Sequence, residues 1–269
     1  MMKISQFLLI ATSLVLLQHA ALAQQKPTVQ SYPKEAPKSV AFIGNSFFYF
    51  NNGIISNLAP MVAEGMKGAP LRQSMITISG SGFDWHDVDS YFRPNAIGKY
   101  SFNAQNEVVV NPPQKPLFDA AVLMDCSQCP IHPQMKSVFT EYAKKHSDTV
   151  RRQGSVPVFF MSWAYKDKPE MTIPLADAYT AAGNENGVLV IPVGLAFARS
   201  IAIKPEIELY APDKRHPSVA GTYLSAATTY ATLFNQSPVG LKYTAGLSPE
   251  VALHLQQVAN DTVKEYQKR

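Results

Sequence analysis

Residues 39–46, with the sequence SVAFIGNS, decide the fold that the chain is expected to adopt. The first five of them form an apolar run with β-branched and aromatic side chains, which predicts a buried strand. Gly44, Asn45 and Ser46 follow directly, and a glycine before a serine at this point suits a sharp turn from strand to helix. The turn would leave the hydroxyl of Ser46 exposed at the end of the strand, in the position that a nucleophile needs.

Four further apolar runs follow along the chain and alternate with segments of helical length and mixed polarity. The expected strands are residues 40–43, 74–78, 120–124, 156–161 and 188–193, and the expected helices are residues 54–66, 136–152, 172–186, 217–234 and 249–267. Near-continuous apolar strands that alternate with helices are typical of a parallel sheet covered on both faces. We therefore expect an α/β fold, a three-layer α/β/α sandwich with a five-stranded, mainly parallel sheet. Residues 91–118 break the alternation and are interpreted as an insertion or hairpin over one edge.

Residues 1–23 have the pattern of a secretory signal peptide. Lys3 precedes an apolar core at residues 7–17, and a small-x-small cleavage site closes the segment. An uncleaved membrane anchor is the alternative, although the apolar core is short for a bilayer span. Residues 24–38 are polar with several prolines and predict a flexible tether, which leaves residues 39–269 as a single domain. We expect export to the periplasm or the exterior, and a mature chain without a membrane span.

The composition argues against two other classes of protein. The formal net charge is +4, and no run of Lys and Arg is interleaved with aromatic residues, so nucleic acid binding is not expected. Acidic and histidine residues cluster at Asp84, His86, Asp87 and Asp89. Their spacing matches no familiar set of metal ligands, so we interpret them as a solvated helix start and expect no metal. The separate histidines His132 and His146 are interpreted as surface residues.

Cys126 and Cys129 form a Cys-x-x-Cys pair in a chain that is expected to be exported. Disulfides persist outside the cytoplasm, so we predict a local disulfide that braces a loop, with two unpaired thiols as the alternative. A thioredoxin-like redox role is not favoured, because Pro130 falls outside the pair rather than within it.

Asp213 and His216 offer a carboxylate and a base three residues apart on one loop. A serine hydrolase needs such a base beside its nucleophile, so Ser46, His216 and Asp213 are the candidate catalytic residues. Ligands of parallel sheets bind beyond the carboxyl ends of the strands, which is where Ser46 is expected. Trp163 and Tyr165 follow the fourth expected strand and are candidates for lining the substrate cleft, with packing under the loop as the alternative.

Four sequence blocks, in order, resemble the SGNH hydrolase superfamily, also called GDSL-like esterases and lipases. The resemblance runs from residue 40 to about residue 234. The stretches FIGNSFFYFN, SGFDWH, SQCP and HPSVAGTYLSAA are similar to a bacterial branch of poorly defined substrate. The resemblance implies Ser46 as the nucleophile, His216 as the base and Asp213 as the acid that orients it.

The resemblance also implies an oxyanion hole that includes the N–H groups of Ser46 and Gly80. The superfamily completes this hole with an Asn side chain after the third strand. The count along this chain puts Gln128 at that position, with Ser127 as the alternative. Asn45 replaces the Asp that usually precedes the nucleophile, a residue outside the triad. Neither a metal nor an organic cofactor is implied.

Together these inferences predict an exported serine ester hydrolase that cleaves an acyl or acetyl ester through an acyl-enzyme. Carbohydrate is the expected alcohol part of the substrate, by analogy with the superfamily. Two alternatives stay open. One is a non-catalytic glycan-binding protein on the same fold, favoured by the altered third block, and the other is an O-acyltransferase. The expected partner is a small-molecule or glycan ester, and the oligomeric state is left open.

Overall fold

The structure, a computed structural model, describes residues 25–268 except 69–70, 94–95 and 113–114. The expected signal peptide, residues 1–23, lies outside the described residues. In the described part, no helix is both long and apolar enough to cross a membrane.

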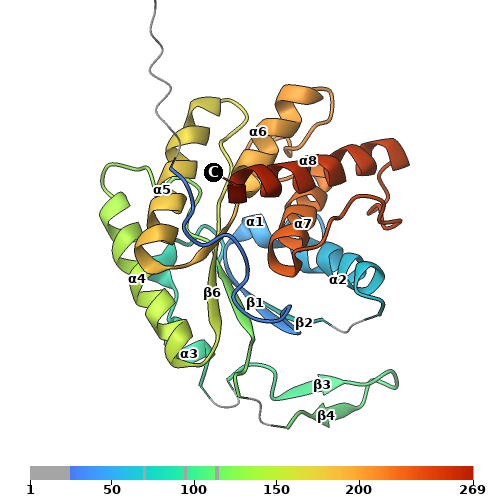
Figure 1. Cartoon of the computed structure of the whole chain (residues 1–269). Coiled ribbons are helices and arrows are strands. Elements are labelled where there is room, and N and C mark those ends of the chain that lie inside the picture. Colours follow the sequence, from blue (N-terminus) through green and yellow to red (C-terminus); the bar gives the residue numbers. More distant parts are fainter. Residues whose placement is uncertain (1–24, 69–70, 94–95, 113–114, 269) are drawn as a thin grey trace, which may run out of the picture.

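Five parallel strands form the central sheet, in the order β2-β1-β5-β6-β7 (Figure 1). They are β1 (Ser39–Gly44), β2 (Arg72–Thr77), β5 (Ala120–Leu123), β6 (Val156–Phe160) and β7 (Leu189–Ile191). The predicted five-stranded parallel sheet is confirmed. The fifth strand is shorter than expected, because the chain turns at Pro192 and helix α6 begins at Val193.

Strand β1 lies where the strand order reverses, with β2 on one edge and β5 on the other. In open α/β sheets the crevice at such a point, beyond the carboxyl ends of the strands, is where ligands bind. The short helix α1 (Ser46–Tyr49) starts one residue after Asn45 at this crevice. The topology therefore puts Ser46 at the expected ligand site.

Alternate side chains of the strands pack into two separate cores. In β1, Val40 and Phe42 belong to one core, whereas Ala41 and Ile43 belong to the other. The first core includes α2 (Gly53–Gly65), α6 (Val193–Ile203), α7 (Val219–Phe234) and α8 (Pro249–Lys268). The second includes α3 (Val88–Tyr91), α4 (Lys136–Arg152) and most of the buried side of α5 (Thr172–Asn186). The predicted three-layer α/β/α sandwich is confirmed.

Helix α7 runs through the interior, and every residue in it except Val219 is buried. Its many small residues let α2, α6 and α8 pack around it. Four buried hydroxyls donate to the carbonyl four residues earlier, those of Ser225, Thr228, Thr229 and Thr232. The N-terminus is capped by Ser218, whose hydroxyl accepts from the N–H of Gly221 at 3.1 Å. The cap fixes the direction in which the preceding loop, with His216, leaves the helix.

Residues 25–38 differ from the free tether that was expected. They form no helix or strand but lie along the domain, between α5 and the start of β1 (Figure 1). Tyr32 is buried, and its hydroxyl donates to the carbonyl of Asp119 at 3.0 Å. The N–H of Thr28 donates to Asn184 at 2.7 Å. The polar composition of the segment does not predict these contacts. One buried tyrosine and a few hydrogen bonds are enough to hold the segment on the domain.

A hairpin of β3 (Tyr100–Phe102) and β4 (Val108–Val110) occupies part of residues 91–118. It projects from the lower end of the domain, away from the layers of helices (Figure 1). Its apolar side chains are exposed, those of Tyr100, Phe102, Val108, Val109 and Val110. The 3-10 helix η1 (Phe83–Trp85) and α3 precede this stretch.

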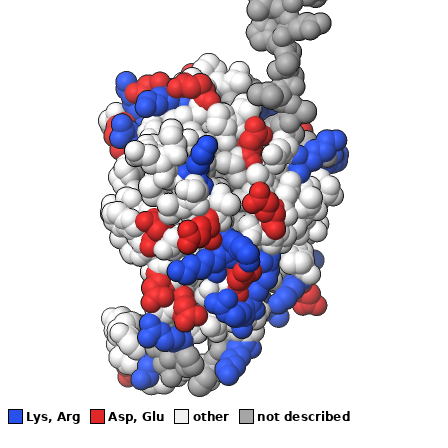
Figure 2. Space-filling view, turned by 90° about the vertical axis from the view of Figure 1, so that its left-hand side faces the viewer, with Lys and Arg blue, Asp and Glu red and all other residues white. Residues whose placement is uncertain are grey.

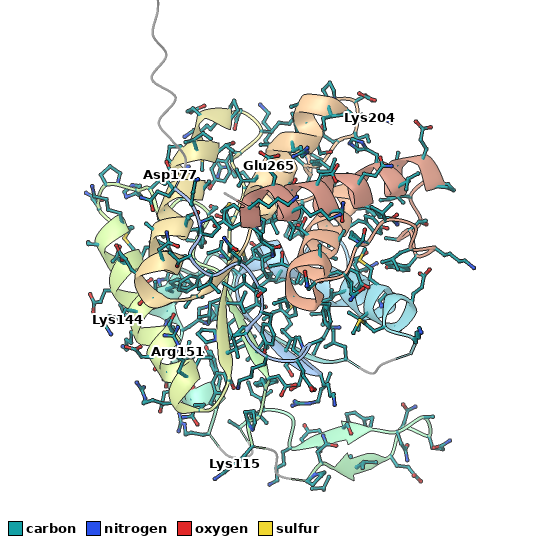
Figure 3. The ribbon with its side chains drawn as sticks, in the orientation of Figure 1. Lys115, Lys144, Arg151, Asp177, Lys204 and Glu265 are labelled. Atoms are coloured by element: carbon teal, nitrogen blue, oxygen red, sulfur yellow. A yellow bond between two sulfur atoms is a disulfide. The ribbon has the colours of Figure 1, made fainter. Side chains whose placement is uncertain are left out.

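Charged side chains lie on the surface, with both signs interspersed on the face shown in Figure 2. Two ion pairs join α8 to α6 and its C-cap, Arg199 with Glu265 at 2.7 Å and Lys204 with Glu250 at 3.2 Å. Lys204 and Glu265 are labelled in Figure 3. Exposed pairs of this kind contribute only about 0–1 kcal/mol each. The buried side chains of Leu255, Val258 and Ala259 therefore hold α8 against the domain.

Replacing Gly194 with alanine tests the close approach of α6 to the end of β6. A Cβ at this position would lie 2.3 Å from the carbonyl oxygen of Ser162, a backbone atom that cannot swing aside. We expect Gly194→Ala to lower the free energy of unfolding by about 1–3 kcal/mol, measured by urea denaturation. Lys264→Ala, at an exposed position of α8, serves as the control and should change it by less than about 0.5 kcal/mol. An unchanged Gly194→Ala midpoint would contradict this packing.

Candidate active site

Ser46 lies at the first position of α1, immediately beyond the end of β1. Asn45 is the N-cap of this short helix, and its side-chain oxygen accepts from the N–H of Phe47 at 3.2 Å. The cap ends the strand and turns the chain into the helix within one residue. The turn that the sequence predicts at Gly44, Asn45 and Ser46 is therefore present, with the serine hydroxyl at the switch point of the sheet.

Ser46, His216 and Asp213 meet in one chain of hydrogen bonds. His216 Nε2 lies 2.8 Å from Ser46 Oγ, and His216 Nδ1 is hydrogen-bonded to Asp213 Oδ2. Because the carboxylate can only accept, Nδ1 carries the proton and Nε2 is free to accept from the serine hydroxyl. The ring of Phe50 stacks on that of His216 with the centroids 3.8 Å apart. The structure thus brings together the three residues that the sequence selected.

The loop of Asp213 also organises itself around the carboxylate. Asp213 Oδ1 accepts from the N–H groups of Arg215 and His216, both at 2.9 Å. Burial alone would raise the pKa of this carboxyl, but the hydrogen bonds from His216 and from the two N–H groups outweigh it and lower the pKa to about 2. Asp213 is therefore ionised at neutral pH and able to stabilise a protonated His216.

Trp163 does not line a cleft, which corrects the sequence-based expectation. It is fully buried, and its ring stacks between Phe47 at 4.4 Å and Phe197 at 4.3 Å. Its indole N–H donates to the carbonyl of Arg215 at 2.9 Å. Trp163 thus supports Arg215, the residue before His216. The alternative interpretation, that Trp163 packs under the loop, is therefore the correct one.

Tyr165 lies nearer to the candidate site but is also mostly buried. Its hydroxyl is 2.6 Å from Ser127 Oγ, and the guanidinium of Arg215 lies over its ring at 4.8 Å. It contributes to the wall of a hollow of about 500 Å³ beside α6. Tyr165 therefore connects the loop after β5 with the loop that carries His216.

The residues predicted for the oxyanion hole follow β2 and β5. Gly80 occupies the third position of a turn in which the N–H of Ser81 donates to the carbonyl of Ile78 at 3.1 Å. Its φ of +74° requires the freedom of glycine. Within the described residues, the N–H of Gly80 donates to no protein group. The Gln128 amide lies 3.9 Å from Met171 Sδ. The roles of Gly80 and Gln128 at the oxyanion stay predictions.

Cys126 and Cys129 are joined by a disulfide. The bridge closes a small loop that contains Ser127 and Gln128, the two candidates for the third oxyanion donor. In the described part of the chain, no group of three or more His, Cys, Asp or Glu side chains could hold a metal ion.

His86 and His146 are buried, which corrects the interpretation of both as solvated residues. His86 Nε2 lies 3.1 Å from the carbonyl of Gly44 and 2.9 Å from Ser81 Oγ, while Nδ1 lies 3.1 Å from the hydroxyl of Tyr91. Burial lowers the pKa of His86 to about 4 and also lowers that of His146. His146 Nε2 lies 2.8 Å from the carbonyl of Phe83. Each histidine has an internal partner, which sequence spacing does not reveal.

Asp125 is a buried carboxylate that the sequence pattern did not single out. Its Oδ1 accepts from the N–H groups of Phe83 at 2.6 Å and Cys126 at 2.8 Å. Burial raises the pKa of this carboxyl to about 6, against the opposing effect of the two backbone hydrogen bonds. The position after an apolar strand was a usable signal, since polar residues at the carboxyl edge of a parallel sheet gather around its ligand site.

The fold is similar to several solved structures. A DUF4886 family protein from Bacteroides uniformis is 16% identical, with 84% of this chain and 94% of that chain covered and a TM-score of 0.57. A candidate SGNH hydrolase from Slackia heliotrinireducens is 22% identical, with 72% and 97% covered and a TM-score of 0.51. Axe2, an acetylxylan esterase from Geobacillus stearothermophilus, is 15% identical, with 75% and 96% covered and a TM-score of 0.52.

These likenesses show that the chain has the fold of the SGNH hydrolases. No family model matches the chain, and no curated protein matches its sequence. All of the similar structures named here are below 25% identity, so they establish the fold alone.

Replacing Asp125 with asparagine tests the raised pKa through stability. Between about pH 4 and pH 6 the unfolded chain loses this proton while the native state keeps it, so Asp125 lowers stability as the pH rises through that window. Asparagine does not titrate, so the free energy of unfolding of Asp125→Asn relative to wild type should rise by about 2 kcal/mol from pH 4 to pH 7. Denaturation at both pH values measures this difference. Asp89→Asn, at an exposed position, is the control, and a pH-independent difference for Asp125→Asn would contradict the assignment.

Proposed function

We propose that the protein is an exported serine ester hydrolase of the SGNH type. The observation that carries the proposal is the hydrogen-bonded chain from Ser46 Oγ through His216 to Asp213, with 2.8 Å between Oγ and Nε2, at the switch point of an SGNH-like sheet. A nucleophile, a base within hydrogen-bond reach and a carboxylate that orients the base are the parts that acyl transfer requires. Export rests on the signal-peptide pattern of residues 1–23.

In the proposed reaction His216 Nε2 takes the hydroxyl proton of Ser46 as Oγ attacks the ester carbonyl. Asp213 holds the imidazole in the required tautomer and stabilises the imidazolium. The negative oxygen of the tetrahedral intermediate accepts from the N–H groups of Ser46 and Gly80 and from the Gln128 amide. Collapse returns the proton from His216 to the leaving alcohol, and the acyl-enzyme is hydrolysed by a water that His216 deprotonates.

An acetyl or short acyl ester on a carbohydrate is the proposed substrate. Support comes from Axe2, described as an acetylxylan esterase. Two of its catalytic mutants replace a histidine and an aspartate that lie three positions apart, the spacing of Asp213 and His216 in this chain. The analogy supports both the ester class and the pairing of the acid with the base.

A non-catalytic glycan-binding protein is the second candidate. It is favoured by the third block, where Gln128 replaces asparagine and its amide lies beside Met171 Sδ. An oxyanion hole with one donor displaced would lower the rate while leaving the cleft intact. Labelling of Ser46 by a fluorophosphonate separates the two candidates, because an inert serine is not labelled. An O-acyltransferase would transfer acyl groups to added sugar faster than it hydrolyses the ester.

Removing the nucleophile or the base should abolish hydrolysis of short-chain nitrophenyl esters. We expect Ser46→Ala and His216→Ala each to lower kcat/KM by at least about 10⁴-fold, and Asp213→Asn by up to about 10⁴-fold. Ser79→Ala, an exposed serine in a neighbouring loop, is the matched control and should keep wild-type activity and fluorophosphonate labelling. Activity that survives in both Ser46→Ala and His216→Ala would rule out the proposed mechanism.

The third oxyanion donor can be assigned by comparing the two neighbouring candidates. Gln128→Ala should lower kcat by about 10²-fold with little change in KM, because the lost hydrogen bond forms only in the transition state. Gln128→Asn keeps an amide and should recover part of the loss. Ser127→Ala should leave kcat within a few-fold of wild type. A larger loss in Ser127→Ala than in Gln128→Ala would transfer the role to Ser127.

A further inference from the structure

Two buried polar side chains, Asn45 and Asp125, connect the three loops that carry Ser46 and the proposed oxyanion donors. The loops follow β1, β2 and β5 and hold Ser46, Gly80 and Gln128 respectively. Each of the two side chains bonds to a backbone group of at least one loop other than its own. The connection is therefore between loops, independent of the proposed catalytic side chains themselves.

The Asn45 amide uses both its donor and its acceptor. Nδ2 donates to the carbonyl of Ser81 at 3.0 Å and to the carbonyl of Asp125 at 3.1 Å, while Oδ1 accepts from the N–H of Phe47. Ser81 directly follows Gly80, and Asp125 opens the loop that contains Gln128. A carboxylate at this position has no proton to give to the two carbonyls, so only an amide of this size makes all three bonds.

Asp125 also connects two of the loops, but its side chain accepts hydrogen bonds, whereas Nδ2 of Asn45 donates them. The N–H of Phe83 comes from the loop after β2, and the N–H of Cys126 from the loop after β5. The chain can approach the carboxylate this closely because residue 82 is glycine, where a Cβ would lie 3.0 Å from Asp125 Oδ1. Asp125 is only 2% exposed, and among the described residues its Oδ2 has no hydrogen-bond partner. Within the described residues, the hydrogen bonds of this buried carboxylate are therefore made by Oδ1 alone.

Among the described residues, no neighbouring cation offsets the charge of Asp125. Asp84 of η1 is close enough for its charge to raise the pKa of Asp125, and the hydroxyl of Tyr179 on α5 accepts from the Asp125 N–H at 3.3 Å. No Lys or Arg among the described residues forms an ion pair with Asp125. Its backbone hydrogen bonds are thus the interactions that stabilise the ionised form.

We propose that Asn45 and Asp125 are positioning residues that hold the oxyanion hole in its reactive geometry. The inference rests on the proposed esterase function. Oxyanion donors act at about 2.7–3.1 Å from the position of the developing charge, and a displacement of about 1 Å can lower the rate 10²-fold. Without the two side chains, the loops of Gly80 and Gln128 lose their shared attachment beside Ser46. The transition state is then stabilised less, while ground-state binding of the ester changes little.

Four variants test this positioning role. Asn45→Asp and Asp125→Ala should lower kcat on nitrophenyl acetate by about 10²-fold with KM within a few-fold of wild type. Asp125→Asn keeps a carbonyl oxygen for the two N–H groups and should recover most of the loss, whereas Asn45→Ala should behave like Asn45→Asp. The control is Gln256→Ala, which removes a buried amide that bonds to Tyr223, Gly240 and Leu241 in another part of the domain. The kcat of Gln256→Ala, expressed per serine that the fluorophosphonate labels, should equal that of the wild type.

Fluorophosphonate labelling separates positioning from loss of folded protein. The final extent of labelling counts reactive serines, while the rate of labelling depends on the oxyanion hole that receives the phosphoryl oxygen. We expect full labelling at a lowered rate in Asn45→Asp and Asp125→Ala, in proportion to their loss of kcat. Variants that match the active wild type in kcat and labelling rate would overturn the positioning role alone. A wild type that is neither active nor labelled would overturn the proposed function, and the positioning role with it.

Discussion

The hydrogen bonds of the Asn45 side chain are the constraint on which the candidate site depends. Parallel strands deliver their loops to one edge of the sheet, but topology alone leaves those loops free to diverge. The amide of Asn45 caps α1 and at the same time binds the carbonyls of Ser81 and Asp125. One side chain thereby fixes the direction of the serine-bearing turn and its distance from the two neighbouring loops. Because all of these groups are buried, each lost bond would leave an unpaired polar atom away from water.

A second set of contacts supports the loop of His216 from beneath. Trp163 stacks between Phe47, which follows Ser46, and Phe197 of α6, and it donates to the carbonyl of Arg215. Ser46 and His216, the proposed nucleophile and base, thus lie in segments that pack on the same indole. The stacked rings therefore join the segment of Ser46 to the loop of His216 through one buried aromatic layer.

The sequence predicts those parts of the fold and of the site that depend on the local pattern or on the chemistry of single residues. Apolar strands such as residues 40–43 belong to a sheet covered on both faces, and their pattern needs no knowledge of partners. Ser46, Asp213 and His216 stand out because their chemistry is specific. The environments of Trp163, His86 and Asp125 cannot be predicted in this way, because a tryptophan, a histidine or an aspartate in a loop has the same appearance in the sequence whether it faces substrate or backbone. Each of these side chains instead bonds to a backbone group far away in the sequence: Trp163 to Arg215, His86 to Gly44 and Asp125 to Phe83. Such long-range contacts leave no pattern in the sequence.

The side chains of Asn45 and Asp125 are complementary. The superfamily usually has an Asp before the nucleophile, and here that position faces two carbonyl oxygens, those of Ser81 and Asp125. An ionised Asp would meet both with no donor, next to the buried carboxylate of Asp125, and like charges at close range in a dry site are costly. The neutral amide removes that repulsion and supplies the missing donors. The neutral amide of Asn45 is therefore the side chain that suits a site shared with the buried Asp125, because it supplies the two donors without adding a second charge.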